Sequence, residues 1–237
     1  MSTGTRDRIV DSSAELFRRQ GYVGTGMKQI VAAASAPFGS VYHFFPGGKE
    51  QLAAEVIRSS GALYLQLFAG IALQAADVPE GIDNFFAGAA ETLLETDFAD
   101  ACPIATVALE VASTNEPLRI ASAEVFESWI DAASAYLASA GIEHDQARAL
   151  AFAMLSLLEG AFVLSRALRS TEPLQAARAS ALAAVRAALP AAGCGAPPAP
   201  APAGRPAGDR SSARVATPPQ PRRRCPRRSP SGAAAGR

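Results

Sequence analysis

The side chains best suited to chemistry are few and lie far apart in the sequence. The chain of 237 residues holds three cysteines, Cys102, Cys194 and Cys225, and two histidines, His43 and His144. The cysteines have neither the spacing of a disulfide framework nor that of a Cys-x-x-Cys metal site. Two histidines also argue against a zinc site built on imidazole ligands. We therefore expect neither a metal nor a cofactor.

Catalysis by this chain would have to start from Cys102, which directly precedes Pro103. The candidate base is His144, 42 residues further along, and no third residue that could orient it is evident. The sequence has no Gly-rich phosphate loop after a strand and no pair of acids in a catalytic setting. A structural cysteine at the start of a helix is the preferred interpretation. We predict that the protein is not an enzyme.

The zero net charge of the chain hides an uneven distribution of charged residues. The balance is +2 over residues 1–60, −10 over residues 61–190 and +8 over residues 191–237. An acidic middle repels nucleic acid, so any contact with DNA has to come from the two ends. Residues 191–237 also hold ten of the seventeen prolines and no Leu, Ile, Phe, Trp or Tyr. This composition predicts a disordered tail.

The arginines of this tail leave two interpretations open. The tail is either passive or an arm that touches phosphates nonspecifically. In the second case the whole protein could be a nonspecific nucleic-acid binder driven by its tail. Deleting residues 191–237 separates these interpretations, because a tail-driven binder loses most of its affinity.

Apolar residues recur every three or four positions through residues 1–190, which predicts helices and no strands. The first helix ends at Gly21, and the stretch Pro79-Glu80-Gly81 is expected to break the chain between two later helices. Pro103 can open a helix, and Asn115 and Thr171 are candidate helix caps. The expected ranges are about 9–20, 27–34, 37–44, 48–74, 82–98, from 103, 116–140, 143–169 and 173–189.

Residues 25–45 combine two short helices with a turn at Ser35-Ala36, which is the pattern of a helix-turn-helix. The second helix of such a motif lies in the major groove of DNA, and the first braces it against the backbone. Met27, Ile30, Val31, Val41 and Phe45 are expected to form the small core that sets the angle between the helices. The predicted DNA-contacting residues are Thr25, Lys28, Pro37, Phe38, Gly39, Ser40, Tyr42, His43 and Lys49.

The stretch from Asp7 to Leu52 resembles the DNA-binding domain of TetR/AcrR-type transcriptional repressors. The resemblance rests on "LFRRQGY" at residues 16–22, on Thr25 as the residue that opens the second helix, and on "GSVYHFFP" at residues 39–46 followed by Lys49-Glu50-x-Leu52. The sequence "FPGGK" at residues 45–49 is similar to the LmrA/YxaF-type subgroup. Cys102-Pro103 and Glu159-Gly160-Ala161 match that subgroup further along the chain.

Two positions depart from the family pattern. Ser35 stands in the turn where members usually carry Gly, which predicts a strained or different turn. Phe38 stands where members usually carry a polar or basic residue. A phenylalanine can pack against a thymine methyl but gives no bidentate contact to guanine.

The resemblance implies an all-α fold with an N-terminal three-helix helix-turn-helix domain, residues 1–48. A helical ligand-binding and dimerisation domain, residues 49–190, follows, and the disordered tail is residues 191–237. It further implies a cytoplasmic regulator that binds double-stranded operator DNA as a homodimer. A small effector then releases the protein from DNA, which is the family's usual mode.

The late helices carry an independent indication of the dimer. Residues 149–164 are apolar on nearly all sides, which predicts burial all round and favours a subunit interface. The alternative is a central core helix of a monomer. The resemblance places the interface in the helices at about 143–169 and 173–189, as a four-helix bundle between two subunits. The sequence contains no run of 18 apolar residues, so we expect no membrane partner.

For the effector, the sequence offers mainly aromatic and aliphatic side chains. We predict contacts from Phe85, Phe126, Trp129, Phe152 and Glu159, and an effector that is apolar or aromatic with one or two polar groups. Each aromatic residue has the alternative interpretation of an ordinary core residue.

Overall fold

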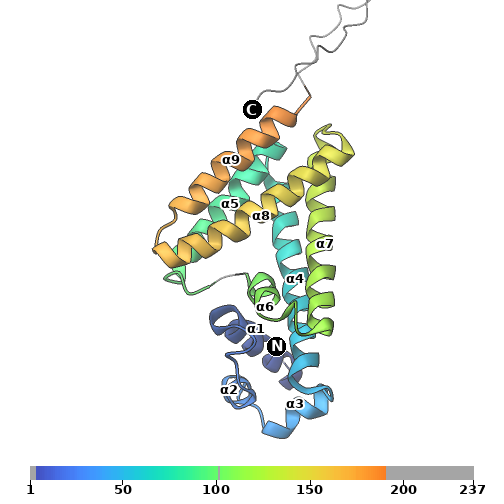
Figure 1. Ribbon diagram of the computed structural model, residues 1–237, viewed down its shortest axis with the longest axis vertical. Coiled ribbons are helices and arrows are strands. Elements are labelled where there is room, and N and C mark those ends of the chain that lie inside the picture. Colours follow the sequence, from blue (N-terminus) through green and yellow to red (C-terminus); the bar gives the residue numbers. More distant parts are fainter. Residues whose placement is uncertain (1–3, 101, 191–237) are drawn as a thin grey trace, which may run out of the picture. The chain divides into compact units, whose positions relative to one another are not determined.

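Regular structure in the computed structural model, which describes residues 4–100 and 102–190, is entirely helical (Figure 1). This confirms the all-α prediction for the part of the chain described; the predicted tail, residues 191–237, lies outside it. The helices of the described residues are α1 Thr5–Gln20, α2 Met27–Ala33, α3 Phe38–Phe44, α4 Gly48–Gln74, α5 Val78–Glu95, α6 Pro103–Val111, α7 Glu116–Ser139, α8 His144–Leu168 and α9 Glu172–Ala188.

The first three helices pack around fully buried aliphatic and aromatic side chains. Phe17 of α1, Ile30 of α2 and Val41 of α3 are each 0% exposed. The Nε of Arg8 on α1 donates a hydrogen bond to the carbonyl of Ala34, 3.1 Å away at the end of α2. These contacts fix α2 and α3 relative to α1, as a helix-turn-helix requires.

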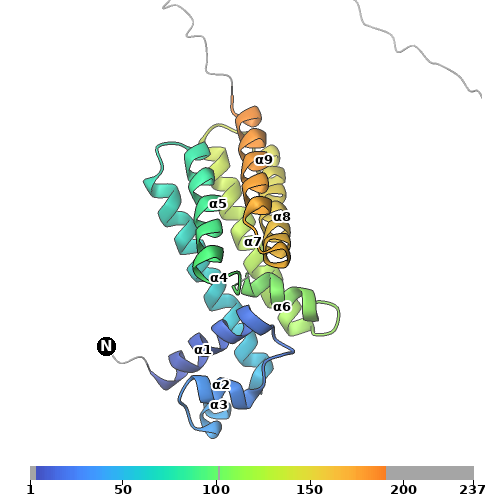
Figure 2. The ribbon, with the colours of Figure 1, turned by 90° about the vertical axis from the view of Figure 1, so that its left-hand side faces the viewer.

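The core of this N-terminal region does not end where α4 begins. Ile104 and Val107 of α6 and Leu118 of α7 belong to the same buried cluster as Val41 and Phe45. The boundary predicted at residues 48/49 therefore falls inside a shared core. Figure 2 shows α6 and one end of α7 beside the first turns of α4, next to α1–α3.

Helices α4 and α7 run side by side in close contact (Figures 1 and 2). Gly61 of α4 makes this possible, since a Cβ added there would lie only 2.5 Å from a methyl carbon of Val125. The indole Nε1 of Trp129 on α7 donates to the Gly61 carbonyl at 2.9 Å. The long α4 is thus fixed both to the N-terminal helices and to the second bundle.

A second buried cluster joins α5, the C-terminal half of α7, α8 and α9. Its largest fully buried side chains include Ile82, Phe86, Leu93 and Leu137. Arg178 of α9 forms a two-pronged ion pair with Asp83 of α5, through its Nε at 2.6 Å and its Nη2. Helices α8 and α9 pack against each other along one side of this bundle (Figure 2).

The predicted break at Pro79-Glu80-Gly81 is wrong. Helix α5 begins at Val78, and Asp77 caps it by accepting a hydrogen bond from the Glu80 N–H at 2.8 Å. Pro79 lies in the first turn, where a proline costs no hydrogen bond. The helix also ends at Glu95, before the predicted Phe98.

Two of the three other predicted helix starts agree with the structure, and the third agrees only in position. Pro103 opens α6, and Asn115 caps α7 by accepting from the Leu118 N–H at 3.0 Å. Thr171 occupies the N-cap position of α9, but its side chain makes no capping hydrogen bond. Instead the hydroxyl of Ser170 accepts from the Glu172 N–H at 3.1 Å.

Two helices of the described residues, α4 and α8, are long and apolar enough to cross a membrane by length and composition alone. Core helices pass the same test. Both pack here against other helices of the bundle, and α8 also carries an apolar face described below.

Candidate DNA-binding surface and effector cavity

Helix α3 has one face in the core and the other in solvent. Val41 and, just after the helix, Phe45 are 0% and 1% exposed, whereas Phe38 and Tyr42 are 49% and 50% exposed. The two exposed rings lie 5.9 Å apart, centroid to centroid. Gly39 has open space around the position of a Cβ, so the helix can approach a groove closely on this side.

The predicted DNA-contacting residues are mostly accessible. Lys28, Pro37 and His43 are exposed, and Ser40 is partly exposed. Thr25 requires a correction, because its side chain is buried. Its hydroxyl donates to the Gly21 carbonyl at 2.6 Å and accepts from the Gln20 amide at 3.2 Å. Thr25 also precedes the N-cap Gly26 and does not open α2.

The start of α4 differs from a simple phosphate-binding helix end. The N–H groups of Gly47 and Gly48 already donate, to the Gln51 side chain and to the Phe45 carbonyl, each at 2.8 Å. The Lys49 ammonium lies 4.2 Å from the centroid of the Tyr22 ring. Partial burial lowers the pKa of Lys49, and the Glu110 carboxylate opposes that shift. The N–H groups of Gly47 and Gly48 are therefore occupied within the protein, and the Lys49 side chain remains the candidate DNA contact here.

Ser35 in the turn between α2 and α3 has a left-handed backbone with φ of +48°. Residues other than Gly, Asn and Asp adopt this region at a cost of roughly 1–2 kcal/mol. The strain expected from a serine in place of glycine is present in the structure.

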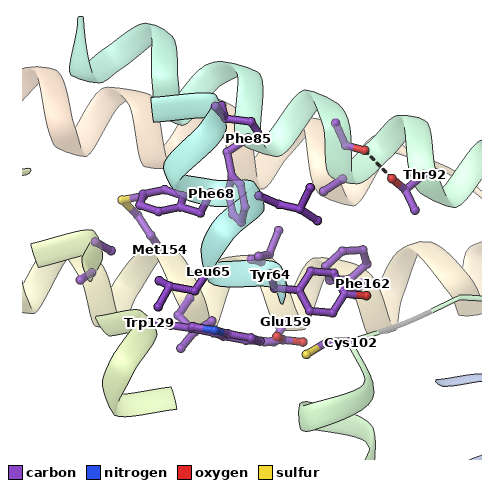
Figure 3. A pocket seen from close by; sticks show the side chains of 18 of the residues that line it. Tyr64, Leu65, Phe68, Phe85, Thr92, Cys102, Trp129, Met154, Glu159 and Phe162 are labelled. Carbon is purple, nitrogen blue, oxygen red and sulfur yellow. Dashed lines mark hydrogen bonds between the residues drawn. The ribbon is translucent and has the colours of Figure 1, made fainter. Parts of the chain in front are cut away.

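A cavity of about 330 Å³ opens within the second bundle (Figure 3). Its wall is almost wholly apolar and comes from several helices. Helix α4 contributes Tyr64, Leu65, Leu67, Phe68 and Ile71; α5 contributes Phe85, Gly88, Ala89, Thr92 and Leu93. Helix α7 contributes Trp129, Ile130 and Ala133; α8 contributes Ala151, Met154, Leu155, Leu158, Glu159 and Phe162, and Asp100 and Cys102 complete the wall. The volume lies within the range that binds small molecules.

Two polar side chains of the wall, Glu159 and Cys102, lie together. Figure 3 shows the Glu159 carboxylate beside Cys102 and next to the Trp129 ring. Burial raises the pKa of Glu159 to about 7, and a hydrogen bond with Cys102 opposes the shift. Burial and, secondarily, Glu159 raise the pKa of the Cys102 thiol, and burial raises that of the Tyr64 phenol. Cys102 and Tyr64 are therefore neutral near pH 7, whereas Glu159 changes charge there.

The five predicted effector residues divide into two groups. Phe85, Trp129 and Glu159 line the cavity. Phe126 and Phe152 do not: Phe126 packs against the first core beside Trp129, and Phe152 is 44% exposed. Sequence reasoning missed the contribution of α4, above all Tyr64 and Phe68. Helical periodicity places an aromatic residue on an apolar face but does not tell whether that face meets another helix or a space.

One wall residue also reaches the DNA-binding region. Asp100 lies with its carboxylate 2.8 Å from Nε of Arg18 and 3.7 Å from Nε of Arg19, both on α1. The preceding segment is held from α8, because Arg166 donates to the carbonyls of Phe98 and Ala99 at 3.3 and 3.2 Å. The cavity wall thus contacts α1 directly through Asp100. It also includes residues of α4, which itself packs against α1.

Helix α8 carries an exposed apolar face directed away from the cavity. Leu157, Leu164 and Leu168 are 37%, 54% and 65% exposed and follow helical spacing, with Gly160 on the same face. Leu158 is only 7% exposed and lines the cavity. Of the two interpretations for residues 149–164, this face favours the subunit interface.

The Cys102–His144 pair does not exist in the structure. His144 is exposed at the start of α8, where its ring lies 3.4 Å from Asp145. Cys102 instead contacts Glu159, fifteen residues further along α8, or about 22 Å at 1.5 Å per residue. No group of three or more His, Cys, Asp or Glu side chains suited to a metal occurs in the described part of the chain.

Two family models and several known regulators match the sequence of this chain. The family model of TetR-type bacterial regulatory proteins matches residues 9–56, and that of the C-terminal domain of LmrA/YxaF-like transcriptional regulators matches residues 79–180. The HTH-type transcriptional regulator YxaF of Bacillus subtilis is 34% identical over 170 residues, 72% of this chain and 89% of that protein. The regulator LmrA of the same organism is 33% identical over 175 residues, 73% of this chain and 93% of that protein.

Solved structures show the same fold. A TetR transcriptional regulator from Legionella pneumophila superposes with a TM-score of 0.68 at 22% identity, covering 76% of this chain and 96% of that one. A TetR regulator from Chloroflexus aurantiacus reaches a TM-score of 0.67 at 27% identity, covering 78% and 96%.

An exposed helix α3 on a small core, joined to a second helical bundle, is the architecture of helix-turn-helix transcriptional regulators. The chain belongs to the TetR family, and its second domain is of the LmrA/YxaF-like type. Proteins of this family are DNA-binding transcriptional regulators that act as dimers, and they are not enzymes. The prediction against enzymatic activity is thereby confirmed.

Proposed function

We propose that this protein is a cytoplasmic, ligand-responsive repressor, released from its operator by a small apolar or aromatic effector. The observation that carries the proposal is the cavity of about 330 Å³, whose wall residue Asp100 pairs with Arg18 of the helix-turn-helix region. A ligand in this cavity touches both α4 and the segment that contacts α1. It can therefore favour one position of the DNA-binding helices over another.

The DNA-contacting side chains that we propose are Lys28, Pro37, Phe38, Ser40, Tyr42, His43 and Lys49, with Gly39 allowing close approach of the backbone. Tyr42 and His43 suit contacts to phosphates, and Phe38 suits a thymine methyl. Thr25 is left out because its hydroxyl is used inside the protein.

The effector contacts that we propose are Tyr64, Phe68, Phe85, Trp129, Glu159 and Phe162, in place of the set expected from sequence. They are the aromatic and acidic residues of the cavity wall. The homodimer that we propose uses the exposed face of α8 together with α9. Two such subunits place two recognition helices on successive half-sites of a palindromic operator.

The test begins with genomic DNA captured on the purified protein and sequenced, which should enrich one palindromic site. Compounds are then screened for release of that fragment from the wild type and from Gly88→Leu. Gly88 lines the cavity, and a Cβ there meets no atom within 4 Å, so a leucine takes up cavity space without displacing the fold. Gly70→Leu is the matched control, because Gly70 is equally open but does not line the cavity.

A compound that releases the wild type and Gly70→Leu but not Gly88→Leu supports the proposal. Equal release of all three proteins places the effector outside this cavity. Removal of residues 191–237 should leave binding to the palindromic fragment in place. Loss of most binding on that deletion would favour the tail-driven, nonspecific interpretation.

A further inference from the structure

The charged groups of the cavity wall are all acidic. Among the lining residues, Asp100 and Glu159 carry carboxyl groups, and none is a lysine, arginine or histidine. Asp100 already has a counter-charge, since Nε of Arg18 lies 2.8 Å from its carboxylate. Glu159 forms no ion pair with any cation of the described residues; its neighbour is the neutral thiol of Cys102. One acid therefore faces the cavity without a compensating charge.

Aromatic rings surround this acid. Trp129 lies next to Glu159 in Figure 3, and the rings of Tyr64 and Phe162 lie on the same side of the cavity. The Trp129 indole is held in place by its hydrogen bond to Gly61 and by an edge-to-face contact with Tyr64, 6.1 Å between centroids. Aromatic faces attract cations, Trp most strongly, and the attraction grows when water is excluded. A fixed set of rings around an unpaired carboxyl group is suited to a positively charged ligand.

We propose that the effector is an organic cation, a compact apolar or aromatic body with an ammonium group placed between Glu159 and the ring of Trp129. This inference rests on the proposed function and specifies the ligand class for the same cavity. An anionic effector is disfavoured, because it would bring a second negative charge beside Glu159 in an apolar space without any basic partner. A cation supplies the charge that the wall lacks.

The test compares two probes of the same shape, benzyltrimethylammonium and neopentylbenzene, which differ by a quaternary nitrogen in place of a carbon. Trp129 is the only tryptophan of the chain, so quenching of its fluorescence reports binding in the cavity directly. At pH 8, where Glu159 is mostly ionised, the cation should bind at least about tenfold more tightly than the neutral probe.

The variant Glu159→Gln keeps the size and hydrogen-bonding capacity of the side chain but removes its charge. It should weaken binding of the cation about tenfold and leave the neutral probe unchanged. Glu91→Gln is the matched control, because Glu91 is an exposed carboxylate on α5 that does not line the cavity. Thermal melting of each variant establishes that it is folded.

Lowering the pH from 8 to 5.5 gives a second readout. The quaternary ammonium keeps its charge, so a loss of affinity reports protonation in the protein. The groups around the proposed position are Glu159 on α8, Cys102 at the start of α6, Tyr64 on α4 and the Asp100–Arg18 pair. Wild-type affinity for the cation should fall several-fold at pH 5.5, whereas Glu159→Gln should show no such fall.

Equal affinity for the two probes, tighter binding of the neutral probe, or no binding of the cation at millimolar concentration would overturn the inference. An unchanged cation affinity in Glu159→Gln would do so as well. None of these outcomes bears on release from the operator by compounds found through the screen. The proposed function therefore stands or falls separately, on the comparison of Gly88→Leu with Gly70→Leu.

Discussion

At the scale of single residues, Tyr42 offers a test of the recognition surface. Its ring is half exposed on α3 and contacts Phe38, and the hydroxyl is the only polar group of the side chain. Tyr42→Phe should keep the ring contact and weaken operator binding by about 1.5–3 kcal/mol, the range for one hydrogen bond to a charged group. Binding of the captured fragment, measured by fluorescence anisotropy at fixed salt, gives the value.

Tyr136→Phe serves as the control, since Tyr136 lies in the second bundle, where its hydroxyl donates to the Asp77 carbonyl. That change should leave DNA affinity unaltered. If Tyr42→Phe bound DNA as tightly as the wild type, the hydroxyl would make no phosphate contact.

Ser35 provides a stability prediction from its backbone alone. Because its φ is +48°, glycine at this position removes the left-handed strain. Ser35→Gly should raise the free energy of unfolding by about 0.5–1 kcal/mol, after allowance for the greater freedom of glycine in the unfolded chain. Ser35→Val should lower it, because a branched side chain fits this region poorly. Urea denaturation of both variants decides the matter; two changes of the same sign would mean that the turn relaxes.

Some of these residues could be identified from the sequence and others could not. Ser35 and Phe38 could be singled out because the family motif specifies what usually stands there. The burial of Thr25 could not, because its threonine hydroxyl can contact either a phosphate or a backbone carbonyl, and only the path of residues 21–25 brings the Gly21 carbonyl within 2.6 Å.

Among the helices, α8 has one exposed apolar face and one buried face. Leu164 is 54% exposed on the apolar face, whereas Leu158 is 7% exposed and contacts the interior. Leu164→Glu should leave the subunit folded and convert a dimer to a monomer, because it places a charge in the proposed interface. Leu158→Glu should instead unfold the second bundle, because it buries an unpaired charge within one subunit.

Light scattering for mass and circular dichroism for helix content distinguish the two effects. A folded Leu164→Glu dimer would show that α8 does not form the interface. A wild type that is monomeric well above micromolar concentration would remove the proposed dimer altogether.

Most helices could be predicted from the sequence because their apolar periodicity and caps are local signals. Helix α4 was expected at 48–74 and is found there. The start of α5 is hard to predict because Pro79 and Gly81 resemble helix breakers, although a proline two residues after a capping Asp77 is a start signal. The sharing of one core by α1, α6 and α7 is a long-range property that no local pattern contains.

For the folded molecule as a whole, the buried Glu159 should make the free energy of unfolding depend on pH. Its pKa is raised from 4.5 to about 7 by burial, so the folded state holds a proton that the unfolded chain has already lost. The stabilisation from the protonated form is complete below about pH 4.5 and is lost as the pH rises toward 7. As the pH rises from 5 to 8, the free energy of unfolding of Glu159→Gln should increase by about 1–3 kcal/mol relative to that of the wild type.

Comparison of the two proteins at each pH cancels the titration of all other groups, including the exposed carboxylates. Denaturant unfolding at pH 5 and pH 8 gives the four free energies needed. A constant difference between the proteins would mean that Glu159 is ionised throughout this range.

Occupation of the cavity and binding of operator DNA should be coupled. An effector that releases operator DNA must itself bind more weakly to the DNA-bound protein, by the same factor. The coupling is typically about 5–150-fold for an allosteric protein. Asp100 is the wall residue that pairs with Arg18 of α1, so Asp100→Asn should reduce this factor toward 1 while effector binding to the free protein persists.

Asp83→Asn is the control, because it removes the ion pair with Arg178 inside the second bundle without touching α1. The measurement is the affinity of a releasing compound, by Trp129 fluorescence, with and without saturating operator fragment. Retention of the full factor in Asp100→Asn would assign the coupling to the rigid α4, which at 27 residues and 1.5 Å each extends about 40 Å from the helix-turn-helix into the second bundle. Equal affinities with and without operator in the wild type would show that this cavity is not coupled to DNA.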